Sequence, residues 1–292
     1  MNKKGLTISI IFEAESANYG DSIRNASVLK KMIRNNNKNY TYISRQALRY
    51  SLINALEWNN TPVEAKGKGD AKVVQFSPDA TIKDYAEIDL FGYMKTVSDK
   101  AAITRNAVVR LSNAISLEEY KGSTDYLTNM GLANRKEKLN SSIVKSEIQR
   151  SFYGYTICID LDLVGIDKND NIEIPNEEKA KRINILLEGI EYLYRDIRGR
   201  RENLSPVFVI GGVYDRKNPY FEHRLTLNEE GLNLWPIKDI LKEEDAKNNT
   251  SVGLLKGIFE NEEKIVNDLN PKTIKEFFAE LEGKINEYYK SN

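Results

Sequence analysis

The sequence contains very few of the residues that form disulfides or bind metals. Among its 292 residues there is one cysteine, Cys158, and one histidine, His223. A lone cysteine excludes an internal disulfide, and a lone histidine does not favour a histidine-based metal or acid–base cluster. The apolar stretch near the N-terminus is short and is interrupted by Glu13, and no later run is long enough to span a bilayer. We therefore expect a cytoplasmic protein that needs no cofactor, no metal and no membrane.

The chain also lacks net charge, but its two halves do not. It has 43 Lys and Arg against 43 Asp and Glu. Residues 1–150 hold 23 basic and 16 acidic side chains, whereas residues 151–292 hold 20 and 27. The halves therefore carry +7 and −7. This asymmetry predicts a basic face for a polyanion and an acidic face, which in a head-to-tail array could contact the next copy.

The periodicity of apolar residues predicts an α+β fold. Strands are expected at residues 6–15, 101–111, 151–163 and 206–213, and helices at residues 44–56, 177–198 and 271–290. In chain order the elements before the last helix give β, α, β, β, α, β, which is the ferredoxin-like or RRM-like arrangement. The first strand alternates apolar and polar residues, so one of its faces should be buried.

The remaining segments are predicted to be additions to a single domain that spans residues 1–292. A polar, basic loop is expected at 16–39, insertions at about 57–100 and 112–150, and a C-terminal helical segment at 232–292. The second insertion has few large apolar residues, so it should project from the body or lie on a partner.

The stretch from Thr41 to Leu56 combines a strand end, a helix start and a cationic site. Ser44 can cap a helix, and Leu48 and Leu52 begin a buried stripe. Arg45 and Arg49 lie one turn apart at this helix start, where free N–H groups and the helix dipole favour an anion. A phosphate would fit this site. The alternative is a pair of surface arginines, or arginines paired with carboxylates from elsewhere in the fold.

Three further patterns have both a functional and a structural interpretation. The apolar run at 206–213 ends in Gly211 and Gly212, which allow either close approach of a ligand or a simple turn. Residues 167–178 place acids and amides as in a calcium loop, but Ile172 occupies the position of the essential glycine, so a plain turn is expected. Tyr153 and Tyr155 lie on the apolar face of their strand, so we expect burial rather than base stacking.

Two segments resemble a known family. FEAESANYGDSIRNASVLKKM (Phe12 to Met32) and YTYISRQALRY (Tyr40 to Tyr50) are similar to the DevR family of CRISPR-associated proteins. Arg24 departs from this pattern, where a small residue is expected. The resemblance implies a RAMP-superfamily protein with an RRM-like core, which serves as the CRISPR RNA-binding backbone subunit of a type I-B Cascade complex.

The resemblance also implies partners and a binding site. The partners would be CRISPR RNA, copies of the same chain in a head-to-tail filament, other Cascade subunits, and target DNA through the guide. Finger and thumb projections would hold the RNA, with the thumb placed at 112–150 or at 57–100. The expected RNA-binding residues are Ser44, Arg45, Gln46, Arg49, Arg24, Arg105, Gly211 and Gly212.

Two other functions stay open at this point. Related subunits of type III complexes cut RNA with an aspartate in the loop after the first strand, and Asp21 lies in such a loop, with Glu13 and Glu15 upstream. A carboxylate with bound Mg²⁺ could perform that reaction. The third possibility is a regulator or scaffold that never contacts RNA.

Overall fold

The computed structural model describes residues 3–15, 17–20, 26–34, 37–66, 72–96, 102–135 and 143–292. Arg24 and Asp21 lie outside these residues. In the part of the chain that is described, no helix is long and apolar enough to cross a membrane.

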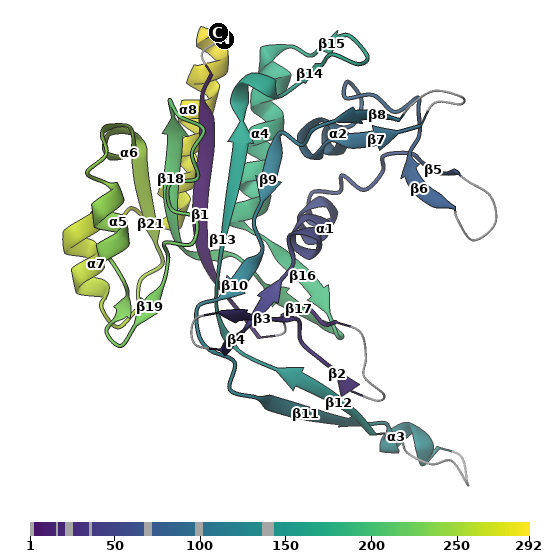
Figure 1. Cartoon of the computed structure of the whole chain (residues 1–292), viewed down its shortest axis with the longest axis vertical. Coiled ribbons are helices and arrows are strands. Elements are labelled where there is room, and N and C mark those ends of the chain that lie inside the picture. The colour runs from purple at the N-terminus through teal and green to yellow at the C-terminus, as the bar shows by residue number, and fades with distance from the viewer. Residues whose placement is uncertain are drawn as a thin grey trace.

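The body is organised around strand β1 (Gly5–Ala14), which is paired along both edges (Figure 1). It runs antiparallel to β13 (Ser151–Asp160) on one side and to β18 (Pro206–Tyr214) on the other. The main sheet, counted over the described residues, has eight strands in the order β21-β18-β1-β13-β10-β4-β3, with β9 also paired to β13. Its remaining members are β3 (Lys31–Arg34), β4 (Lys38–Ile43), β9 (Val109–Leu111), β10 (Ala114–Ser116) and β21 (Thr250–Leu254).

Both faces of β1 are buried, whereas the alternating sequence predicted one. Leu6, Ile8 and Ile10 point toward three helices, as predicted, and Ile11 belongs to a second apolar cluster on the opposite face. The prediction was wrong about the second face because segments far along the chain cover it, and local periodicity does not report them.

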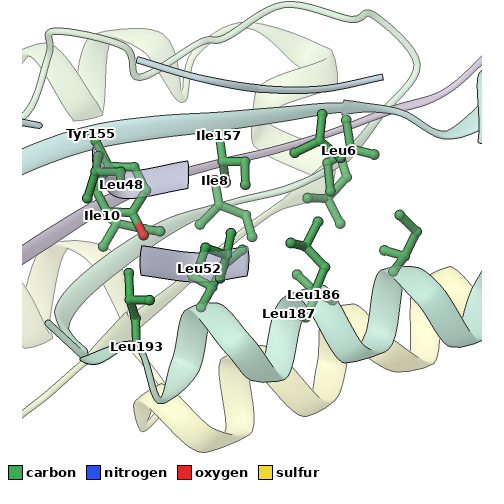
Figure 2. Close-up of a cluster of buried hydrophobic side chains, with 14 of the residues drawn as sticks. Leu6, Ile8, Ile10, Leu48, Leu52, Tyr155, Ile157, Leu186, Leu187 and Leu193 are labelled. Carbon is green, nitrogen blue, oxygen red and sulfur yellow. The ribbon is translucent and has the colours of Figure 1, made fainter. Parts of the chain in front are cut away.

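Three helices cover the first face: α1 (Arg45–Ala55), α4 (Asn176–Glu191) and α8 (Ile274–Ser291). Figure 2 shows Leu48 and Leu52 of α1 and Leu186 and Leu187 of α4 packed against the sheet. Thr273 and Glu276 form a capping box at the start of α8. The helices predicted at 44–56 and 271–290 are therefore confirmed.

The helix predicted at 177–198 is too long. It ends at Glu191, and the chain continues as a hairpin of β16 (Tyr194–Ile197) and β17 (Arg200–Asn203). Arg198 and Gly199 have φ angles of 51° and 76°. Two consecutive positive φ angles are typical of a tight hairpin turn and are incompatible with a continued helix.

The second face is covered by the C-terminal third of the chain. Its elements are β19 (Leu227–Asn228), β20 (Gly231–Leu232), α5 (Trp235–Ile240), α6 (Glu244–Asn249) and α7 (Glu262–Leu269). The segment 232–292 was predicted to be helical, but β21 interrupts it and extends the main sheet by pairing with β18. This segment is therefore part of the same body.

Two sets of smaller elements extend from the body in two directions in Figure 1, and we call them the first and the second projection. The first set contains β5 (Val63–Lys66), β6 (Val73–Phe76), α2 (Ala86–Phe91), β7 (Tyr93–Lys95) and β8 (Ile103–Arg105). The second set contains β2 (Ala26–Ser27), β11 (Ser123–Thr128), α3 (Met130–Ala133) and β12 (Ile143–Ile148). The region 16–39, predicted as a loop, thus contributes β2, β3 and the start of β4.

The region that resembles a calcium loop forms a hairpin of β14 (Ile166–Asp167) and β15 (Ile172–Glu173), close to the 3₁₀ turn Leu161–Leu163. The Asp167 carboxylate accepts hydrogen bonds from the Tyr93 hydroxyl at 2.7 Å and from the Asn169 N–H at 2.9 Å. Within the described ranges, no group of three acidic, histidine or cysteine residues could hold a metal ion. The segment predicted as a plain strand-to-helix turn is therefore a short hairpin that precedes α4.

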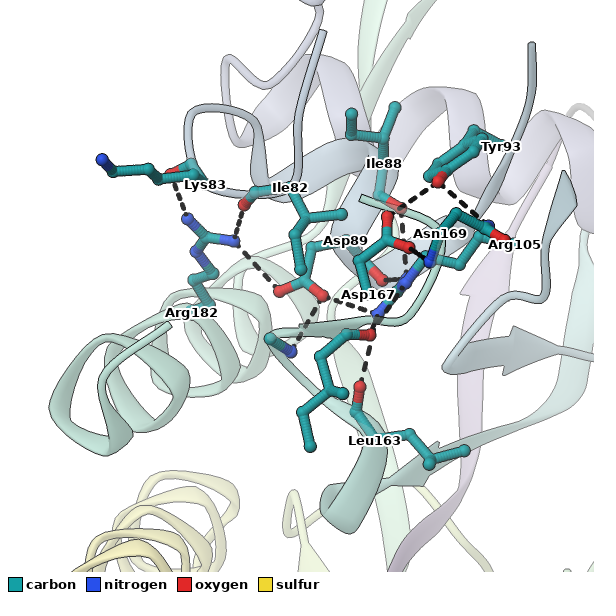
Figure 3. A network of polar contacts seen from close by, with 12 residues as sticks. Ile82, Lys83, Ile88, Asp89, Tyr93, Arg105, Leu163, Asp167, Asn169 and Arg182 are labelled. Carbon is teal, nitrogen blue, oxygen red and sulfur yellow. Dashed lines mark hydrogen bonds and ion pairs between the residues drawn. The ribbon is translucent and has the colours of Figure 1, made fainter. Parts of the chain in front are cut away.

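A buried ion network joins the first projection to the body (Figure 3). Asp89 of α2 is fully buried, and its carboxylate lies 2.9 Å from Arg105 and 3.0 Å from Arg182 of α4. It also accepts the Gly165 N–H at 2.9 Å. Arg105 was expected to contact RNA, but it is 8% exposed and bonded to Asp89 and to backbone carbonyls. This pairing could not be predicted from local sequence, because the partners come from three separate segments.

This network predicts a large stability cost for neutralising Asp89. Asp89→Asn keeps the shape of the side chain but removes the carboxylate that pairs with the buried Arg105. It also removes one of two carboxylates beside Arg182, which keeps Glu178 at 3.0 Å, so we expect a loss of about 3 kcal/mol in the free energy of unfolding. Asp84→Asn, an exposed change in the same projection that touches only Thr81, should cost less than about 0.5 kcal/mol. Urea unfolding of the two variants measures the difference, and equal midpoints would contradict the role of the network.

Candidate nucleic-acid interface

The tip of α1 forms as predicted, although hydrogen bonds within the protein occupy most of its first N–H groups. Ser44 adopts an extended conformation and its hydroxyl accepts the Ala47 N–H at 3.3 Å. The Arg45 N–H donates to the Asn113 side-chain oxygen at 2.9 Å. Two of the first three N–H groups of the helix are therefore occupied. Less of the tip remains for a phosphate than the sequence suggested.

The two arginines of α1 have different surroundings. Arg45 and Gln46 are exposed, and Arg45 has no acidic partner among the described residues. The Arg49 guanidinium lies 4.9 Å from the Phe91 ring centre and 3.6 Å from the Glu87 carboxylate. Burial lowers the pKa of Arg49, and Glu87 partly offsets this effect. Arg49 thus attaches α1 to α2, which agrees with the alternative of an arginine paired with a distant carboxylate.

Gly211 and Gly212 lie inside β18 rather than in a loop after it. A Cβ atom on Gly211 would lie 2.1 Å from the Thr7 carbonyl oxygen, and one on Gly212 would lie 2.0 Å from that of Asn249. The expectation of a glycine loop near a ligand is therefore wrong. These glycines are needed because backbone segments approach them on both sides. The basic residues just beyond are also engaged, since Arg216 pairs with Glu243 at 2.6 Å.

The expected site residues are therefore only partly brought together. Ser44, Arg45 and Gln46 share the α1 tip, while Arg49 lies on the flank of the helix that faces α2. Arg105 belongs to the buried network, and the two glycines belong to the centre of the sheet.

A groove of about 570 Å³ runs along the other flank of α1. We call it the α1 groove. It is lined by Ala17, Asn18, Tyr19, Ala47, Tyr50, Ser51, Asn54, Ala55 and the residues of β16. Tyr50 is 69% exposed and Tyr194 is 37% exposed. The buried Asn18 side-chain oxygen has no hydrogen-bond partner among the described residues. Exposed aromatic rings such as Tyr50 and Tyr194 are suited to contact with unpaired bases.

Four arginines in seven residues lie on the β16–β17 hairpin beside this groove: Arg195, Arg198, Arg200 and Arg201. Arg195 and Arg200 pair with Glu202, and Arg201 pairs with Asp196. Arg198 differs, because its guanidinium lies 3.9 Å from the Tyr19 ring centre and bonds the Ser146 hydroxyl of β12. In the described chain no carboxylate pairs with Arg198. Because a helix was predicted at 177–198, these arginines were not recognised as one group on a hairpin. The Arg-Gly-Arg-Arg motif at 198–201 is nevertheless a turn signal.

The second projection exposes many apolar side chains. They are Tyr126, Leu127, Met130, Leu132 and Ile143, each more than half exposed. Exposed apolar side chains do not stabilise a monomer, and patches of this kind are typical of interaction surfaces. Glu147 of β12 fixes the base of the projection, because its carboxylate accepts the Leu29 N–H at 2.8 Å and pairs with Lys31 at 2.8 Å.

The position of the two glycines predicts a packing defect when either is enlarged. Gly211→Ala forces a methyl group against the Thr7 carbonyl, so we expect a loss of about 2 kcal/mol or more in the free energy of unfolding. Gly283→Ala is the control, because nothing lies within 4 Å of a Cβ at that position of α8, and it should stabilise the helix by up to about 1 kcal/mol. Denaturant unfolding checks both, and a Gly211→Ala protein of unchanged stability would restore the loop interpretation.

The comparisons agree with this architecture. The fold is similar to a chain of a "CRISPR RNA-guided surveillance complex", with a TM-score of 0.61, 12% identity, and coverage of 96% of this chain and 99% of the other. It is also similar to a chain of a "CRISPR RNA-guided surveillance complex, pre-nicking", with a TM-score of 0.59, 10% identity, and coverage of 87% and 93%. A comparison with curated proteins found no match. The model of the family described as "CRISPR-associated negative auto-regulator DevR/Csa2" matches residues 6–228, which is most of the sequence, and the chain therefore belongs to this family.

Proposed function

We propose that the chain is the CRISPR RNA-binding backbone subunit of a type I-B Cascade complex in the cytoplasm. Several copies would lie along one guide RNA and present its bases for pairing with target DNA. Membership of the DevR/Csa2 family and a fold similar to chains of RNA-guided surveillance complexes support this assignment.

The α1 groove and its arginines are the observation that carries the proposal. In Figure 1, α1 and the β16–β17 hairpin lie between the two projections. Arg45 and Arg198 have no acidic partner among the described residues, so their charge is available to phosphates. Tyr50 and Tyr194 add aromatic surface in the same groove. Contacts of this type hold a sugar-phosphate chain without reading its sequence.

We further propose that the two projections are the finger and the thumb. The set β5 to β8 with α2 would be the finger, and β11, α3 and β12 would be the thumb. The exposed apolar residues of the second set are suited to contact with a neighbouring copy. The opposite charges of the two halves of the chain favour head-to-tail contacts.

We propose an RRM-like core within this body. The strands β18, β1, β13 and β9 are adjacent in that order and antiparallel, and α1 and α4 pack on the same face. The chain order β1, α1, β9, β13, α4, β18 is that of a ferredoxin-like fold. The α8 helix and the elements after β18 would be additions to this core.

We propose no catalytic role for the chain. The alternative, RNA cleavage by Asp21 with Mg²⁺, has a direct test: incubate the assembled complex with labelled complementary RNA and Mg²⁺. Cleavage that disappears with Asp21→Ala would replace the structural function by a nuclease. A chain that purifies without nucleic acid, judged from its 260-to-280 nm absorbance ratio, would instead favour a regulator that does not contact RNA.

The proposed function predicts that removing the two unpaired charges weakens guide binding. The variant Arg45→Gln with Arg198→Gln should bind guide RNA more weakly, and the slope of log K against log salt should fall by about 1 per lost phosphate contact. Lys256→Gln, a charge change at an exposed residue that follows β21, is the matched control and should leave both quantities unchanged. Filter binding at several salt concentrations measures the slopes. An identical slope for the double variant would remove these arginines from the site.

A further inference from the structure

The face of the main sheet opposite α1, α4 and α8 carries small hydroxyl side chains at its centre. Thr7 and Ser9 of β1 and Thr156 of β13 are 2%, 1% and 4% exposed. The Ser9 and Thr156 hydroxyls are 2.7 Å apart and share one hydrogen bond. Each hydroxyl can donate once and accept twice, so this pair keeps unused bonding capacity.

A cavity of about 170 Å³ lies above these hydroxyls, which we call the sheet-face cavity. Ser9, Ser112, Gly154 and Thr156 line it from the sheet, and Phe221 and His223 line it from the segment after β18. A Cβ on Gly154 would meet the Leu117 side chain at 3.2 Å, so a larger residue would press against the lining of the cavity. The floor of the cavity therefore combines hydroxyl groups with a glycine.

A second cavity of about 240 Å³ lies beside the first, and Ser112 and Thr156 line both. Small-molecule pockets typically occupy about 300–1,000 Å³, a size that neither cavity reaches alone and that their summed volumes reach. The two cations in the lining of the second cavity have acidic partners, since Arg110 pairs with Asp160 at 2.6 Å and Lys217 pairs with Asp162.

His223, in the lining of the first cavity, lies 3.9 Å from the Glu222 carboxylate, and the one described cation of the two linings without a carboxylate partner belongs to the same cavity. Arg34 lines it and lies 5.5 Å from the Tyr40 ring centre, with no carboxylate partner among the described residues. His223 lines it as well and has a φ of 58°, a left-handed conformation that is uncommon for a residue other than glycine. Backbone strain of this kind is concentrated at ligand sites. A cation, an imidazole, an aromatic ring and several hydroxyls together suit a phosphorylated sugar with a planar base.

We propose that the sheet-face cavity binds a nucleoside monophosphate, either free or as the terminal nucleotide of an RNA. Arg34 and His223 would hold the phosphate, and Ser9, Ser112 and Thr156 would bond the sugar hydroxyls. The site lies across the sheet from α1, so it is separate from the α1 groove and does not depend on guide binding there.

The test is calorimetric titration of the full chain with AMP, with a 5′-phosphorylated trinucleotide and with adenosine. We expect AMP or the trinucleotide to bind and adenosine to bind more weakly by about tenfold, because the phosphate contributes charge-assisted hydrogen bonds. Preference for AMP identifies a free nucleotide, and preference for the trinucleotide identifies an RNA end. Equal binding of adenosine and AMP, or no binding of either phosphorylated probe at millimolar concentration, would overturn the proposal.

Two variants locate the site. Arg34→Gln should weaken AMP binding by about tenfold, and Thr156→Val, which keeps the shape and removes the hydroxyl, should also weaken it. Arg45→Gln is the control: it should leave AMP affinity unchanged and lower only guide binding. Melting temperatures confirm that each variant is folded, and a second pair, Ser9→Ala with Ser112→Ala, replaces Thr156→Val if that variant does not fold. If none of these sheet-face variants changes the affinity for AMP, the nucleotide binds elsewhere on the chain and the proposal is wrong.

Discussion

Strand β1 is paired on both edges and covered on both faces, and the arrangement of the other elements follows from that. Its ladders to β13 and β18 fix the centre of the sheet, and Leu6, Ile8 and Ile10 require a helical layer on one side. Burying these side chains stabilises the fold by about 1.5–3 kcal/mol each. Because the strand cannot slip by one residue without turning this apolar set to the wrong face, the register of the whole sheet is fixed from its centre.

The central position of β1 also gives the two sides of the sheet different surfaces. The helix side of the sheet supports α1, and α1 presents its tip and one flank to solvent while Leu48 and Leu52 stay in the core. The opposite side has no large apolar residues at positions 7 and 9 of β1, so polar cavities persist there under the segment that follows β18. The main sheet therefore lies between an aromatic groove flanked by arginines and a hydroxyl-lined cavity.

Local features were predictable from sequence, and long-range partners were not. Ser44 and the stripe beginning at Leu48 identified α1, because capping and helical spacing act within a few residues. The same spacing extended the second helix past Glu191, because apolar residues at helical spacing continue into β16, where the chain is already extended. Arg49 and Arg105 looked like free cations because Glu87 and Asp89 lie far from them in the sequence. A lack of acids near an arginine in the sequence therefore does not mean a lack of acids near it in space.

The burial of Asp89 limits how the first projection can be exchanged between members of this family. Its carboxylate is shared between Arg105, at the end of the first projection, and Arg182, in a helix of the body. A projection transplanted from a relative that has no acid at this point would remove one of the two carboxylates beside the buried Arg182 and leave it with Glu178. Exchange of this module between homologues is therefore restricted to donors and recipients whose charges match across the joint, and compensating changes in α4 should accompany any replacement that survives.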